Sequence, residues 1–156
     1  MKLDGIQVLL VEDCPDQQRM LLHVLEGEGA SVCLECDGFA AVRTVQKSIR
    51  KQHLFDVVIM DLVLEASDGI DSTQSIRKLD KDLPVVAITA NGSPEIELKW
   101  RRAGCLEYLE KPLNAQLLIA AVRHAIDKAN ASVARRGCEM GVASRSPLLE
   151  LNAARL

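Results

Sequence analysis

The chain has 156 residues, of which 48% are hydrophobic and 26% are charged. This balance is typical of one globular domain and excludes disordered, collagen-like and low-complexity chains. The net charge of −3 gives no general attraction to nucleic acid or to an anionic membrane surface. No apolar run approaches the ~20 residues of a membrane span, and the first residues lead directly into an apolar strand without a signal peptide. We therefore expect a cytoplasmic protein with neither nucleic acid nor membrane as a partner.

Short apolar runs alternate with helical patterns in the first part of the chain. The elements expected there are, in chain order, a strand at 6–11, a helix from Pro15 that Gly29 stops, a strand at 31–36, a helix over 39–49 and a strand at 57–60. Pro15 is a favourable first residue for a helix. The run at 57–60 is apolar on both faces, which places that strand in the middle of a covered sheet.

The same alternation continues to about residue 130. The elements expected are, in chain order, a helix from its N-cap Asp68 to about Leu79, a strand at 84–88, a helix from about Ser93 to Ala103, a strand at 106–110 and a helix over 117–129. Strands and helices joined by short loops predict a five-stranded, doubly wound parallel α/β sheet in residues 1–130. Residues 131–156 are expected to be a C-terminal tail: a linker stub, an extension of the last helix or a docking peptide.

The sequence contains five cysteines, two of which form a C-x-x-C pattern at Cys33 and Cys36. This pattern raises the question of redox or zinc chemistry. In the predicted strand, however, residues three apart point to opposite faces. No second Cys or His pair stands at ligand spacing to complete a zinc site. We expect reduced, packed thiols.

Polar residues follow several of the predicted strands. They are Glu12 and Asp13 after the first, Asp61 after the third, Thr89 after the fourth and Lys111 after the fifth. In an open α/β sheet, ligands bind beyond the carboxyl ends of the strands. Two carboxylates ~4 Å apart repel by ~4 kcal/mol at an effective dielectric constant of ~20, so three carboxylates with one lysine favour a divalent cation. All-oxygen ligation suits Mg²⁺ or Mn²⁺. Asp61 is the expected nucleophile and would accept a phosphoryl group.

These residues resemble the receiver domain of two-component response regulators over about residues 4–130. The matching motifs are, in order, Val8-Leu9-Leu10-Val11-Glu12-Asp13, Asp56-Val57-Val58-Ile59-Met60-Asp61 with Asp68-Gly69, Ala87-Ile88-Thr89-Ala90, and Ala103-Gly104-Cys105 with Tyr108-Leu109-Glu110-Lys111-Pro112. The resemblance implies a (βα)5 flavodoxin-like fold. It also implies phosphorylation of Asp61 by a sensor histidine kinase or a histidine phosphotransfer protein, with no enzyme activity beyond self-phosphorylation and dephosphorylation.

The resemblance also implies roles for individual residues. The ligands of Mg²⁺ would be Glu12, Asp13, Asp61 and the backbone carbonyl of Val63. Thr89 would bond the phosphoryl oxygens, Lys111 would pair with them, and Tyr108 would move with Thr89 as a switch. The face made by 93–103, 106–110 and the last helix would then bind a partner, a second copy or an attached domain. The Lys111–Pro112 bond is expected to be cis.

The loop after Asp61 departs from the family pattern. Where the family commonly has Met-Pro, this chain has Leu64-Glu65, which removes a proline that would stiffen the loop and adds a negative charge near the site. Val63 and Asn91 stand at positions that help to set the rate of acyl-phosphate hydrolysis in receivers, so the lifetime of the phosphoryl group stays open.

Two other classes of function remain open at this point. One is a phosphohydrolase with an aspartate nucleophile, although that class usually has a second acid where Val63 stands. The other is a degenerate receiver that acts only as a binding module. The Leu3-Asp4-Gly5 start and the pattern of Ala103-Gly104-Cys105 followed by Tyr108 resemble receivers of hybrid sensor kinases, with a stand-alone regulator as the alternative. The sequence has no Gly-rich nucleotide motif, so we expect the chain to accept phosphate without using ATP.

Overall fold

The computed structural model describes residues 2–90 and 92–140. Their strands are β1 (Gln7–Val11), β2 (Ser31–Glu35), β3 (Val57–Asp61), β4 (Val85–Thr89) and β5 (Glu107–Glu110). Their helices are α1 (Pro15–Gly27), α2 (Gly38–Lys51), α3 (Gly69–Leu79), α4 (Pro94–Ala103) and α5 (Ala115–Met140). The strands pair in parallel in the order β2-β1-β3-β4-β5. The predicted doubly wound α/β fold is confirmed.

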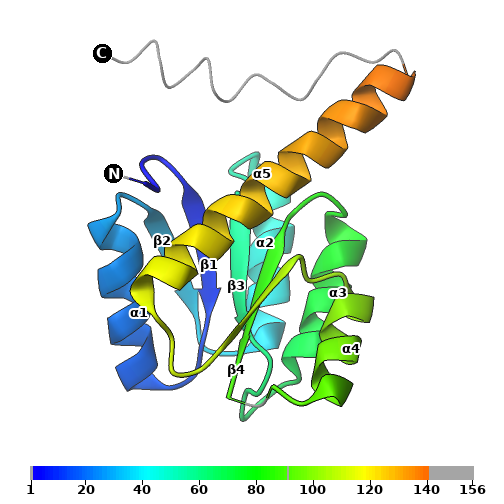
Figure 1. Ribbon diagram of the computed structural model, residues 1–156. Helices are drawn as coiled ribbons and strands as arrows, with labels where there is room; N and C mark the ends of the chain where they lie inside the picture. The colour runs from blue at the N-terminus through cyan, green and yellow to red at the C-terminus, as the bar shows by residue number, and fades with distance from the viewer. Residues whose placement is uncertain (1, 91, 141–156) are drawn as a thin grey trace.

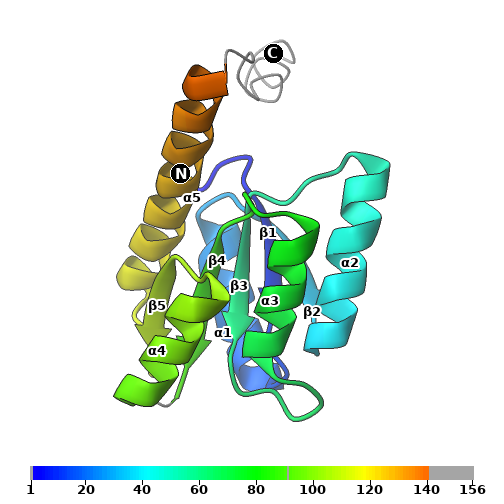
Figure 2. The same ribbon diagram turned by 90° about the vertical axis from the view of Figure 1, so that its right-hand side faces the viewer.

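Helices cover both faces of the sheet, with α1 and α5 on one face and α2, α3 and α4 on the other (Figures 1 and 2). The period of two along each strand divides the core accordingly. On β1, Val8 and Leu10 pack with α1 and α5, whereas Leu9 and Val11 pack with α2 and α4. Every residue of β3 and of β4 is buried. The central position predicted for β3 from its apolar character is therefore confirmed.

Local sequence signals fix the ends of the helices that flank the site. Asp68 caps α3, because its carboxylate accepts a hydrogen bond from the Ile70 N–H at 2.7 Å. Ser93 caps α4 in the same way, and Gly104 ends that helix in the left-handed conformation with φ of 94°. The N-cap predicted at Asp68 and the helix predicted from about Ser93 to Ala103 are confirmed. The two N-caps mark where the loops that follow β3 and β4 at the carboxyl edge of the sheet end.

Helix α5 runs further than its apolar stripe predicted. An end near residue 130 was expected, but the helix continues to Met140 and projects past the body of the domain (Figure 1). The residues just after 130 are mostly Ala and Arg, which favour a helix without needing a buried face. Arg136 pairs with Asp82 in the loop between α3 and β4. The division of the chain at residue 130 stays a prediction, and residues 141–156 lie outside the described part.

None of the helices in the described part of the chain combines the length and the apolar character that crossing a membrane requires.

Candidate functional site

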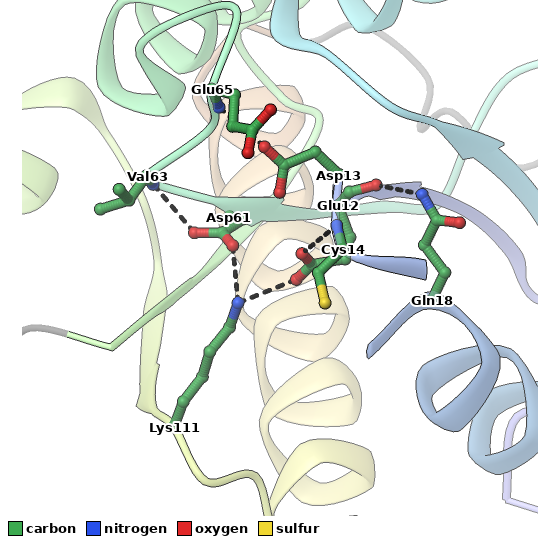
Figure 3. Close-up of polar contacts among 8 residues, drawn as sticks. All are labelled: Glu12, Asp13, Cys14, Gln18, Asp61, Val63, Glu65 and Lys111. Atoms are coloured by element: carbon green, nitrogen blue, oxygen red, sulfur yellow. Dashed lines mark hydrogen bonds and ion pairs between the residues drawn. The ribbon is translucent and has the colours of Figure 1, made fainter. Parts of the chain in front are cut away.

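Four of the predicted site residues meet at the carboxyl edge of the sheet. Glu12 and Asp13 follow β1. Asp61 ends β3, and Lys111 follows β5 (Figure 3). One oxygen from each of the three carboxylates lies within 4.8 Å of the others. Because β1 and β3 are adjacent parallel strands, their carboxyl ends deliver these side chains to one place.

Lys111 is the cation of this cluster. Its Nζ donates to Asp61 Oδ2 at 2.6 Å and to Glu12 Oε2 at 2.9 Å. Burial by itself lowers the pKa of a lysine, but the hydrogen bonds to Asp61 and Glu12 outweigh burial and raise the pKa of Lys111 above 10.5. The ammonium is therefore charged around neutral pH. When all three carboxylates are ionised, the cluster keeps two negative charges in excess.

Glu12 is completely buried and held on three sides. Its Oε1 accepts the Cys14 N–H at 3.0 Å, its Oε2 accepts from Lys111, and its backbone carbonyl accepts from the Gln18 side chain at 2.7 Å. Burial raises the pKa of Glu12, and the neighbouring Asp61 carboxylate raises it further, against the opposing effects of Lys111 and the Cys14 N–H. A carboxylate buried beside another is stabilised when a cation is present.

Both oxygens of Asp61 are engaged. Oδ2 accepts from Lys111, and Oδ1 accepts the backbone N–H of Val63 at 2.8 Å. Val63 also bridges to Asp68, with its own side chain exposed. Gly69 then passes so close to β3 that a Cβ on it would lie 2.1 Å from the Asp61 carbonyl oxygen. This tight return of the chain holds the backbone at Val63 beside the carboxylate of Asp61.

The loop between β3 and α3 is attached to neighbouring elements at two further points. The Glu65 N–H donates to Asp13 Oδ2 at 2.7 Å, and the Ser67 hydroxyl accepts the N–H of Gly38 at 2.7 Å. The sequence drew attention to Glu65 only as a lost proline and an added charge. The hydrogen bond from its backbone to Asp13 had no signal in the sequence, since every non-proline residue carries the same donor.

Thr89 and Tyr108 lie on the neighbouring strands. Thr89 ends β4 and is buried, and its carbonyl accepts the N–H of Lys111 at 2.8 Å. Tyr108 is on β5, where its ring stacks on Trp100 of α4 with centroids 5.3 Å apart and planes at 2°. The Tyr108 hydroxyl is buried without a hydrogen-bond partner among the described residues. Asn91 lies outside the described residues.

Two smaller predictions have different outcomes. The Lys111–Pro112 bond is cis, as expected. Cys33 is half-buried and its thiol is free, but Cys36 is exposed, so the prediction of packed thiols is wrong for that residue. The reason is that β2 ends at Glu35 and lies at the edge of the sheet, where the following residue turns to solvent.

Known proteins resemble this chain over the same region. One curated relative is the transcriptional regulatory protein ZraR of Escherichia coli K12, 30% identical over 96% of this chain and 34% of the relative. Another is Histidine kinase 1 of Arabidopsis thaliana, 28% identical over 77% of this chain and 13% of the relative. The chain thus spans about a third or less of these relatives.

Solved structures show the same fold. One is the receiver domain of a sensor histidine kinase from Pseudomonas aeruginosa PAO1, crystallised with a magnesium ion coordinated in its active site cleft. It is 31% identical, with a TM-score of 0.71 over 79% of this chain and 98% of that one. A chemotaxis protein from Vibrio cholerae is 27% identical, with a TM-score of 0.70 over 77% and 98%. The family model of the response regulator receiver domain matches residues 8–123, and the chain therefore belongs to this family of two-component signalling domains.

Proposed function

We propose that this chain is a phosphoacceptor that takes a phosphoryl group on Asp61 from a phosphohistidine. The donor would be a sensor histidine kinase or a histidine phosphotransfer protein. One observation carries the proposal: Asp61 lies beside Lys111 and within reach of the Glu12 and Asp13 carboxylates, at the carboxyl edge of a receiver sheet. An isolated acidic group on a surface would need neither the half-buried lysine nor the second buried carboxylate.

The donor set fits a divalent cation. Glu12, Asp13 and Asp61 offer only oxygen, and their ligand atoms converge within 4.8 Å. Hard cations such as Mg²⁺ take oxygen ligands and keep some of their water, which leaves room for a phosphoryl oxygen. We assign the site to Mg²⁺, with Mn²⁺ as a substitute and the Val63 carbonyl as a further ligand. When bound, the cation supplies positive charge that offsets the charge of the phosphoryl oxygens.

The transfer needs few protein groups. An oxygen of Asp61 attacks phosphorus, the P–N bond of the phosphohistidine breaks, and the imidazole leaves with the bonding pair and gains a proton. The product is an acyl phosphate. Lys111, which pairs with Asp61 before transfer, then pairs with the phosphoryl oxygens, and the hydroxyl of Thr89 donates to them. Hydrolysis returns Asp61 and inorganic phosphate, so the chain is regenerated without any further enzyme activity.

Phosphorylation would change the surface of the domain through Thr89 and Tyr108. Movement of Thr89 toward the phosphoryl group would draw Tyr108 with it and reshape the face formed by α4, β5 and α5. Leu98 on α4 and Leu117 on α5 are large exposed apolar side chains, which favours this face as the docking surface for a partner or a second copy. We place this exchange in the cytoplasm and the end of the receiver domain near residue 130. A stand-alone regulator and the receiver of a hybrid kinase would differ in the partner that binds to the face formed by α4, β5 and α5.

The test is the mass of the intact chain after incubation with acetyl phosphate and Mg²⁺. We expect addition of one phosphoryl group that is lost in EDTA and in Asp61→Asn. Asp56→Asn, which removes a partly buried aspartate immediately before the same strand, is the matched control and should still be phosphorylated. If the folded wild-type chain binds Mg²⁺ but gains no phosphoryl group, it is a binding module only. If Asp61→Asn is still labelled, the acceptor is another residue.

A further inference from the structure

The Asp13 carboxylate is held by the backbone of a residue distant in sequence. The Glu65 N–H donates to Asp13 Oδ2 at 2.7 Å across a separation of 52 positions. In Figure 3, Asp13 lies between Glu65 on one side and the Glu12–Asp61 pair on the other. The carboxylate of Asp13 therefore has one oxygen engaged by the loop, and one of its oxygens lies within 4.8 Å of an oxygen of Glu12 and of Asp61.

Glu65 is able to do this only because it is not proline. Proline has no N–H, so a proline at this position would leave Asp13 without its donor. The donor is also well fixed. The loop carries the bridge between Val63 and Asp68, and Ser67 accepts the N–H of Gly38 at the start of α2. A hydrogen bond from N–H to an ionised carboxylate is stronger than one between neutral groups.

Carboxylates that ligate metals are commonly oriented by hydrogen bonds from a second layer of groups. Asp13 is only half-buried, so packing constrains it less than it constrains Glu12. We propose that Glu65 is a positioning residue of the cation site, whose backbone N–H holds the Asp13 carboxylate in the orientation that binds the divalent cation. This inference rests on the cation site of the proposed function and deepens it.

The side chain of Glu65 plays a smaller part than its backbone. Its carboxylate is exposed at the rim of the site, where solvent and salt screen its charge. Two substitutions separate the two contributions. Glu65→Gln removes the charge and keeps the N–H, whereas Glu65→Pro removes both.

The experiment is calorimetric titration of the full chain with Mg²⁺ alone, without any phosphoryl donor. We expect Glu65→Pro to weaken Mg²⁺ binding by about 10-fold or more, the effect typical of losing such an orienting partner. Glu65→Gln should stay within about 3-fold of wild type, as expected for a screened charge. Asp71→Asn, which removes one exposed charge from the first turn of α3, is the matched charge control. Equal or tighter Mg²⁺ binding by folded Glu65→Pro would overturn the proposal.

A second measurement decides the question if Glu65→Pro does not fold. In the ¹⁵N-labelled wild-type chain saturated with Mg²⁺, we expect the Glu65 amide to stay protected from exchange with solvent. The reference is the Gly38 amide at the start of α2, which donates to Ser67 of the same loop. Exchange of the Glu65 amide at the rate of an exposed group, with Gly38 still protected, refutes the positioning role. If wild type itself binds no Mg²⁺, the cation site of the proposed function fails as well. If wild type and Glu65→Pro bind equally, only this inference fails.

Discussion

Replacing Lys111 by methionine removes the cation of the cluster while keeping the length of the side chain. In the wild-type chain its Nζ lies 2.6 Å from Asp61 Oδ2 and 2.9 Å from Glu12 Oε2. The side chains of these three residues are 13%, 5% and 0% exposed, respectively. The variant therefore leaves two buried carboxylates facing each other without a positive partner. We expect a marked loss of stability when no divalent cation is present.

The size of the loss follows from the burial of the pair. Removing one partner of a buried ion pair costs about 3–5 kcal/mol, because the remaining charge stays out of water. We expect the lower end, about 3 kcal/mol, because each carboxylate keeps a backbone N–H donor, from Cys14 to Glu12 and from Val63 to Asp61. For a chain of this size, that loss lowers Tm by about 6–12 °C.

The assay is thermal and urea unfolding followed by circular dichroism, in EDTA and again in Mg²⁺. Mg²⁺ should recover part of the loss, because a cation that binds only the folded chain stabilises it. A double-mutant cycle with Glu12→Gln should give a coupling energy of at least about 1 kcal/mol. A loss below about 0.5 kcal/mol in EDTA, the range of an ordinary surface substitution, would refute the reasoning about the buried charges.

The same pair predicts a pH dependence. The pKa of Lys111 is raised in the folded chain above its ordinary value of 10.5. Its contribution to stability is therefore fully present below pH 10.5 and is lost as the pH rises through the folded pKa. The difference in stability between wild type and Lys111→Met should be constant around neutral pH and shrink in alkaline solution. A difference that grows above pH 10.5 would contradict this sign.

Three further predictions test the packing around the site. Gly69→Ala should lower the free energy of unfolding in urea by about 3 kcal/mol, because its Cβ would lie 2.1 Å from a backbone oxygen of β3. Gly27→Ala, at an open position of α1, should raise it by about 0.5 kcal/mol. Equal effects of the two substitutions would show that the loop shifts to make room for the new side chain. At mildly alkaline pH, iodoacetamide should alkylate exposed Cys36 but not Cys105, because burial raises the pKa of Cys105 to about 11 and the thiol stays protonated. Peptide mapping that finds both cysteines labelled equally in the folded chain would contradict this prediction. Trp100 is the one tryptophan of the sequence, and it stacks on Tyr108 of the proposed switch. The fluorescence of Trp100 should therefore change on phosphorylation by acetyl phosphate. An unchanged spectrum at full phosphorylation would argue against movement of Tyr108.

The candidate site was largely predictable because its side chains stand at strand ends. Asp61 follows a run that is apolar on both faces, and that run can lie only in the middle of a covered sheet. Because the strands were predicted to be parallel, Glu12, Asp13 and Lys111 had to lie at the same carboxyl edge of the sheet as Asp61. Their residue types then pointed to a cation and a phosphoryl group.

Other features depended on contacts that the sequence does not encode locally. The stacking of Tyr108 on Trp100 joins β5 to α4, and nothing in the spacing of either residue specifies the partner. The exposure of Cys36 followed from β2 lying at the edge of the sheet. The sequence also left the length of α5 open, with an extension of the last helix as one of three alternatives for the tail, because the last turns need no apolar stripe of their own.

By itself, the sequence determined the alternation of strands and helices, the parallel orientation of the strands and the chemistry of the residues at the strand ends. Hydrophobic periodicity records which face of each element is buried, and that information is local. Only the tertiary structure decided how the carboxylates are held: Lys111 between Asp61 and Glu12, and the Glu65 N–H on Asp13. These contacts join positions 50, 99 and 52 residues apart, and one of them uses a backbone donor that every residue except proline has. Side-chain pattern cannot report such a contact, because folding alone brings the two groups together.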